Sequence, residues 1–150
     1  MSQSISKLYI HLIFSTKSRQ PMIHKDIQAE LHAYMAGILK RQDSPALIIN
    51  SVPDHIHILF RLSKNKALAE IVELVKKASS KWMKEQFGNP SFYWQTGYGA
   101  FSVSSSKVDT ITRYIARQEE HHKRLSYRAE IEKFMEEYDV VEYNPDYFWD

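Results

Sequence analysis

Two histidines two residues apart are the first feature of this sequence that points to chemistry. His55 and His57 lie in the otherwise apolar run VPDHIHILF, residues 52–60. Successive side chains of a β-strand alternate between faces, so both imidazoles share one face with Leu59, and Ile56, Ile58 and Phe60 line the other. Two neighbouring imidazoles can share a divalent cation, whereas burying both without partners is costly. The pair therefore predicts a metal site or, as the alternative, structural histidines with polar partners.

The segment TITRYIARQEEHH, residues 110–122, is the second candidate for chemistry. Tyr114 and Gln118 are four residues apart, so a helix places them on one face, with His121 or His122 one turn further along. A phenol has an unperturbed pKa of about 10, so as a nucleophile it needs a base, or a metal that activates its target. Each of these residues, taken alone, could equally pack or face solvent. Only the spacing to Gln118 distinguishes Tyr114 from the other tyrosines.

The elements that must position these residues follow from hydrophobic periodicity. Runs of β-branched and aromatic residues predict strands over residues 7–16, 46–52, 55–62 and 98–104. Apolar spacings of three and four predict helices from Asp26, as N-cap, to Arg41, over 67–87, from about Val108 onward, and from about Tyr127 to Tyr138. The serines at 104–106 are expected to cap the third helix. The tail from Tyr143 to Asp150 is expected to be extended and docked by its rings.

The order β-α-β-β-α-β predicts the fold class. It is that of a ferredoxin-like, split βαβ, α+β fold, with a four-stranded antiparallel sheet, two helices on one face and extra C-terminal helices. A length of 150 residues suits a single domain over residues 1–150.

Composition narrows the function classes. The chain is 43% hydrophobic and 25% charged, which is typical of soluble globular proteins, and no apolar run approaches the roughly 20 residues of a membrane span. Cysteine is absent, and the first seven residues lack a signal-peptide pattern. We therefore expect a cytoplasmic protein without a membrane partner.

Charge is distributed unevenly along the chain. Residues 136–150 carry six acidic side chains and no Lys or Arg, which leaves +8 over residues 1–135. A basic body is compatible with nucleic acid as a partner, although charge is also needed for solubility. Lys17 and Arg19, directly after the first predicted strand, are accordingly either phosphate contacts or ordinary surface charges.

Four segments together carry a family resemblance: HLIFSTKSR (11–19), VPDHIHIL (52–59), GYGAFSVS (97–104) and YIARQEEHH (114–122). In this order and spacing they resemble the HUH-type tyrosine transposases of the insertion-sequence-200-like group, small enzymes specific for single-stranded DNA. The segments span nearly the whole chain and match at every key position.

The resemblance implies a mechanism. His55, His57 and Gln118 would bind a divalent ion that polarises the scissile phosphate, and Tyr114 would attack it. The products would be a 5′-phosphotyrosine bond and a free 3′-OH. The resemblance implies Mg²⁺, and we expect Mn²⁺ to substitute, because imidazoles suit Mn²⁺ better than Mg²⁺, which prefers oxygen ligands.

The resemblance also implies partners. The substrate would be hairpin-bearing single-stranded transposon ends, with Lys17, Arg19, His121 and His122 as candidate DNA contacts. The enzyme would be a homodimer in which the tyrosine helix can complete the partner chain's site, so action of Tyr114 in cis or in trans stays open.

Two alternative functions remain. The first is a non-catalytic single-stranded nucleic-acid module that stacks bases on aromatic residues of its sheet. Such a module should expose aromatics on its central strands, where this sequence has two histidines. The second is a domesticated HUH nickase that acts on chromosomal repeats, which would use the same site residues.

Overall fold

A four-stranded antiparallel sheet forms the centre of the computed structural model, which describes residues 2–149. The strands are β1 (Leu8–Ser15), β2 (Ala46–Val52), β3 (His55–Leu62) and β4 (Gly99–Val103), in the spatial order β2-β3-β1-β4. β2 and β3 form a hairpin through Pro53 and Asp54. The predicted split βαβ, α+β fold is confirmed by this strand order.

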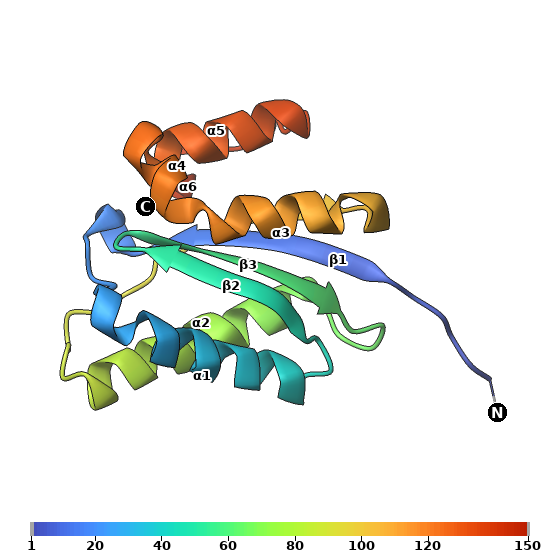
Figure 1. Cartoon of the computed structure of the whole chain (residues 1–150), viewed down its shortest axis with the longest axis horizontal. Helices are drawn as coiled ribbons and strands as arrows, with labels where there is room; N and C mark the ends of the chain where they lie inside the picture. Colours follow the sequence, from blue (N-terminus) through green and yellow to red (C-terminus); the bar gives the residue numbers. More distant parts are fainter. Residues whose placement is uncertain (1, 150) are drawn as a thin grey trace.

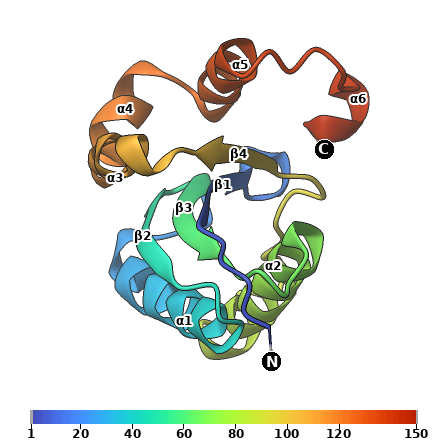
Figure 2. The same ribbon diagram turned by 90° about the vertical axis from the view of Figure 1, so that its right-hand side faces the viewer.

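The helices lie in layers on both faces of the sheet (Figures 1 and 2). One face is covered by α1 (Gln28–Arg41) and α2 (Leu68–Gln86). Above the other lie α3 (Val108–Ala116), α4 (Gln118–Arg124), α5 (Tyr127–Glu137) and the short α6 (Pro145–Phe148). Within residues 2–149, no helix is both long and apolar enough to cross a membrane.

The alternation of β3 decides which helices meet the histidines. Ile56, Ile58 and Phe60 are fully buried in the main core with α1 and α2. Burying each such side chain contributes about 1.5–3 kcal/mol, so this face fixes the register of the strand. Leu59 packs on the opposite face with Ile115 of α3. His55 and His57 therefore lie under α3, α4 and α5, on the same face as Leu59, as predicted.

The predicted tyrosine helix is interrupted in the structure. We expected one helix through residues 110–122, but α3 ends at Ala116, and α4 begins at Gln118 after Arg117 departs from helical geometry (φ −102°, ψ 23°). The side chain of Asn50 on β2 donates hydrogen bonds to the carbonyls of Ile115 (2.8 Å) and Ala116 (3.4 Å). An amide that occupies these carbonyls competes with the next turn of the helix.

The predicted helix starts and the predicted tail also differ from the structure. Asp26 lies in a 3-10 turn, Lys25–Ile27, and α1 begins only at Gln28. Another 3-10 turn, Ser105–Lys107, follows Ser104, whose side chain makes no capping hydrogen bond. The tail is not wholly extended, because Asn144 caps a helical turn that has Pro145 at its first position. Asp150, the last residue of the predicted tail, lies outside the described residues.

Candidate active site

His57 lies at the centre of the buried polar cluster between the sheet and the C-terminal helices. Its Nδ1 is 2.8 Å from Nε2 of His11 on the neighbouring strand, so one of these nitrogens donates to the other. This contact fixes the ring and directs the second nitrogen, Nε2, toward α5. Burial, the largest effect, lowers the pKa of His57. It also lowers the pKa of His11 well below its ordinary value.

His55 is held from both of its ring nitrogens. Nδ1 donates to Oδ1 of Asp54 at 2.7 Å, and Nε2 lies 3.0 Å from Oε1 of Glu130. Burial lowers the pKa of this imidazole, but the two carboxylates outweigh burial and raise the pKa to about 9. The Asp54 contact is the type that orients metal-binding histidines, because it fixes the ring and leaves Nε2 to face the site.

Tyr114 and Gln118 meet the two histidines despite the break between α3 and α4. Gln118 is fully buried, and its Oε1 lies 3.2 Å from Nε2 of His55. The Tyr114 ring is 6.0 Å from the ring of His57, and its hydroxyl donates to Oε2 of Glu130. Burial and then the charge of Glu130 raise the pKa of the phenol above its ordinary value. The four residues predicted for the metal and the nucleophile therefore come together within one chain.

Glu130 and His11 are the site residues that sequence reasoning missed. Glu130 is 2% exposed and interrupts the apolar stripe of α5 formed by Tyr127, Ile131 and Phe134. A carboxylate within an apolar helix face was the signal that could have identified it, since buried carboxylates are paired or bind metals. Burial raises the pKa of Glu130, but hydrogen bonds from the two histidines outweigh it and hold the pKa well below its usual range.

The four predicted DNA contacts lie in two places. His121 stacks on the Tyr114 ring at 4.4 Å, and His122 lies 5.4 Å from the His55 ring. Among the described residues, His121 Nε2 and His122 Nδ1 are buried without a hydrogen-bond partner. Lys17 is exposed, whereas Arg19 donates to the Trp149 carbonyl at 3.4 Å. Both histidines thus border the site, and Lys17 and Arg19 lie just beyond β1, whose last residue pairs with His55.

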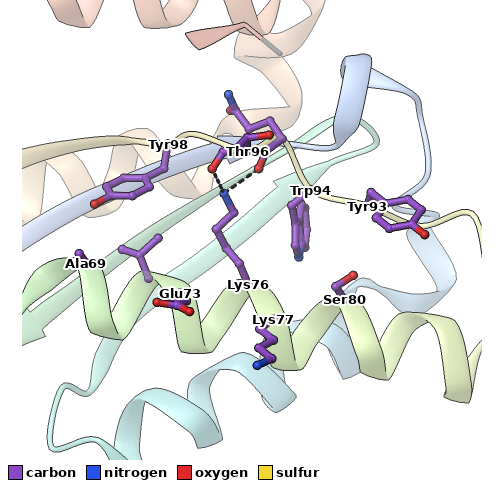
Figure 3. Close-up of a pocket in the computed structure, with 11 residues that line it drawn as sticks. Ala69, Glu73, Lys76, Lys77, Ser80, Tyr93, Trp94, Thr96 and Tyr98 are labelled. Atoms are coloured by element: carbon purple, nitrogen blue, oxygen red, sulfur yellow. Dashed lines mark hydrogen bonds between the residues drawn. The ribbon is translucent and has the colours of Figure 1, made fainter. Parts of the chain in front are cut away.

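A hollow of about 360 Å³ lies away from the histidines, between α2 and the segment that precedes β4 (Figure 3). Lys76 of α2 crosses it and donates to the carbonyls of Gln95 (2.7 Å) and Thr96 (3.1 Å). It also donates to the carbonyl of Gly97 (2.8 Å). Burial lowers the pKa of Lys76 to about 8. Gln95 in turn accepts from the Tyr127 hydroxyl, and the Tyr127 ring lies 5.1 Å from that of His55. Lys76 therefore fixes a loop that supports one wall of the site.

The polar cluster has the donor set of a divalent metal site. His55, His57 and Glu130 each place a ligand atom within 4.8 Å of the others, and the Gln118 amide oxygen adjoins them. Imidazole nitrogen together with amide or carboxylate oxygen suits Mn²⁺, Fe²⁺, Co²⁺ or Zn²⁺, and it suits Mg²⁺ less well. The residues present thus fit a bound divalent cation.

The chain is similar in sequence to known proteins. Residues 4–118 match the protein-family model described as "Transposase IS200 like". The chain is 24% identical over 121 residues to the ISDra2 transposase TnpA of Deinococcus radiodurans, a match that covers 76% of this chain and 86% of that protein.

Two solved structures share the fold. One is a crystal structure of a protein assigned as a transposase from Deinococcus radiodurans, with a TM-score of 0.63 and 24% identity, covering 79% of this chain and 98% of that one. The other is a REP-associated tyrosine transposase bound to a REP hairpin, with a TM-score of 0.59 and 13% identity, covering 83% of this chain and 76% of that one.

Proposed function

The chain belongs to the IS200-like transposase family, enzymes that cut and transfer DNA strands through a tyrosine, and from this premise we propose a metal-dependent transposase that acts on single-stranded DNA. The proposal rests mainly on one observation. The Tyr114 hydroxyl and the Nε2 atoms of His55 and His57 all contact the carboxylate of Glu130. A nucleophile is thereby placed beside a site suited to a cation, as strand cleavage requires.

Tyr114 is the proposed nucleophile. Its phenolic oxygen would form a bond to the scissile phosphorus, the bond from phosphorus to the 3′-oxygen would break, and the departing oxygen would take up a proton. The result is a 5′-phosphotyrosine and a free 3′-OH. A different 3′-OH could then reverse the step and join strands, and no ATP is needed because one phosphoester replaces another.

The metal ligands proposed from the family resemblance are His55, His57 and Gln118. A divalent cation bound there supplies Lewis-acid polarisation of the scissile phosphate. His11 and Asp54 orient the two imidazoles through their second nitrogens. We propose Mg²⁺ as the ion and Mn²⁺ as an effective substitute.

The proposed substrate is single-stranded DNA that carries hairpins. Support comes from the related fold of a transposase described as bound to a REP hairpin. The half-buried rings of His121 and His122 lie beside Tyr114 and His55, at the border of the site, and Lys17 provides an exposed charge. Arg19 already contacts the Trp149 carbonyl, so it would bind DNA only by exchanging that hydrogen bond.

We also propose a homodimer, as the family resemblance implies, with Tyr114 acting in cis. The hydroxyl of Tyr114 lies against groups of its own chain, which supports cleavage beside its own histidines. Light scattering at micromolar protein concentration should give twice the 17.7 kDa mass of the chain. A monomer alone would contradict the dimer but not action in cis.

The non-catalytic alternative is disfavoured by how the sheet is covered. A sheet that stacks bases needs aromatic side chains on an open face. Here α3, α4 and α5 lie over the histidine face, and α1 and α2 cover the other (Figure 2). The domesticated nickase shares the proposed chemistry and differs only in the DNA that it processes.

A covalent-adduct assay tests the proposal. The protein is incubated with labelled single-stranded hairpin DNA and Mn²⁺ or Mg²⁺, and the products are separated on a denaturing gel. We expect a slow-migrating band that chelation abolishes and that is lost in Tyr114→Phe and His57→Ala. Tyr147→Phe is the matched control, because this tyrosine is 77% exposed and lies in α6. An adduct that survives in Tyr114→Phe would exclude this nucleophile.

A further inference from the structure

Glu130 is a buried carboxylate for which the family match gives no role. It lies on α5, twelve positions after the matched residues 4–118 end. A carboxylate that is 2% exposed is costly unless charged or polar groups surround it. Four side chains do so here, and all of them belong to the proposed active site.

The two oxygens of Glu130 have separate partners. Oε1 lies 3.0 Å from His55 Nε2 and 3.1 Å from His57 Nε2. Oε2 accepts from the Gln118 amide at 3.0 Å and from the Tyr114 hydroxyl. One oxygen thus faces the two imidazole nitrogens that the metal requires, and the other faces the nucleophile and the remaining proposed ligand.

The spacing around Oε1 suits a shared cation. Ligand atoms about 2.1–2.2 Å from a six-coordinate ion lie about 3.0–3.1 Å from their neighbours, since an octahedral edge is about 1.4 times the bond length. Both distances from Oε1 to the imidazole nitrogens have this value, at 3.0 and 3.1 Å. A carboxylate also contributes the negative charge and the hard oxygen that two neutral imidazoles lack.

We propose that Glu130 is a further metal ligand, binding through Oε1 beside His55 and His57, while its Oε2 holds the hydroxyl of Tyr114. This inference rests on the proposed metal-dependent function and extends it. The ligand set becomes two nitrogens, one carboxylate oxygen and the Gln118 oxygen, which favours Mn²⁺ over Zn²⁺ more than histidines alone would. The same side chain then positions the nucleophile and the metal relative to each other.

Metal affinity, measured without DNA, tests the proposal. Mn²⁺ is titrated into the full-length protein, and free Mn²⁺ is followed by its electron paramagnetic resonance signal. We expect Glu130→Gln to bind Mn²⁺ at least tenfold more weakly than the parent, since even residues that only orient ligands change metal affinity 10–100-fold. The matched control is Glu132→Gln on the same helix, whose side chain is 48% exposed and pairs with Arg128. It should bind like the parent.

The visible absorption of bound Co²⁺ separates a ligand from a structural residue. A ligand change alters the intensity and position of the bands, whereas a residue that only stabilises the fold leaves them unchanged. Glu130→Gln should therefore give a different spectrum from the parent, and Glu132→Gln the same one. If Glu130→Gln fails to fold by circular dichroism, Glu130→Asp, which keeps the charge but is one methylene shorter, replaces it with the same expectation.

The outcomes separate this inference from the proposed function. Equal Mn²⁺ affinity and identical Co²⁺ spectra in the parent and the Glu130 variant would overturn the ligand role, while a metal site at His55 and His57 would stand. No Mn²⁺ or Co²⁺ binding by the folded parent would overturn both. Weaker Mn²⁺ binding together with a changed Co²⁺ spectrum, in the Glu130 variant but not in Glu132→Gln, supports the inference, whereas weaker binding with an unchanged spectrum would overturn the ligand role.

Discussion

Phe134→Ala should release α5 and, with it, Glu130 from the active site. Phe134 is 8% exposed and belongs to the small apolar cluster between α5 and the sheet. Its ring lies 5.2 Å from that of His11, 5.4 Å from Phe101 and 5.7 Å from Tyr114. The substitution therefore removes one of the buried apolar anchors of the helix that carries Glu130.

The expected loss of stability in Phe134→Ala follows from these contacts. A buried Phe→Ala change costs about 3–5 kcal/mol, and the aromatic pairs within that loss contribute about 0.5–1.5 kcal/mol each. Because Phe134 retains some solvent contact, we expect a value near the lower end, about 3 kcal/mol. The domain as a whole has about 5–15 kcal/mol of stability. A loss of this size is a large part of the domain's stability, and it falls on α5 because Phe134 belongs to the α5 cluster and not to the α1 and α2 core.

Hydrogen exchange measured by mass spectrometry localises the effect. Amides of α5 should exchange much faster in Phe134→Ala, those of β1 and β3 should change less, and Mn²⁺ affinity should fall. Glu136→Ala, an exposed position on the same helix, is the control and should resemble the parent. A loss below 1 kcal/mol in urea denaturation, with unchanged α5 exchange, would refute the reasoning.

Three further predictions concern residues outside the site. The pKa of His32 is lowered to about 4 by burial, below its value of 6.5 in the unfolded chain, so the unfolded state binds the extra proton and stability should fall as pH drops from 6.5 to 4. The free energy of unfolding, measured by urea denaturation at both pH values, should fall by about 1–2 kcal/mol less in His32→Gln than in the parent, a figure reduced to allow for partial solvent contact. The same decrease in both proteins would contradict this prediction. Asn50→Ala removes the donor to the Ile115 and Ala116 carbonyls, and should lower stability in urea by about 1 kcal/mol and slow adduct formation; unchanged stability and an unchanged rate would contradict this. Lys76→Met leaves three loop carbonyls without their charged donor and should lower stability in urea by about 1–3 kcal/mol. Equal stability of the variant and the parent would show that Lys76 does not hold this loop.

Local periodicity was sufficient to predict the fold and half of the site. Alternation along β3 predicts that His55 and His57 share one face, and the structure confirms this because Ile56, Ile58 and Phe60 fill the α1 and α2 core on the other. The spacing of Tyr114 and Gln118 predicted that they lie on one side of a helix. Both residues do lie in the same cluster, although the helix breaks between them. A break caused by the side chain of Asn50, on a strand more than sixty residues earlier, has no local signature.

The other half of the site depends on tertiary contacts. His11 reaches His57 only because β1 pairs with β3, and sequence spacing gives no indication that these two rings meet. Glu130 reaches the histidines only because α5 folds back over the sheet. The apolar stripe of α5 indicated a packed helix but not its target, so an acidic residue in that stripe could not be assigned a partner in advance.

The most direct test of the account is to identify the amino acid that carries the DNA. Adduct formed on single-stranded hairpin DNA with Mn²⁺ is digested with protease and nuclease, and the modified peptide is sequenced by mass spectrometry. The account predicts a nucleotide phosphate on the hydroxyl of Tyr114, within the α3 peptide. A phosphate mapped to any other side chain, or DNA cleaved efficiently without a covalent peptide, would contradict it.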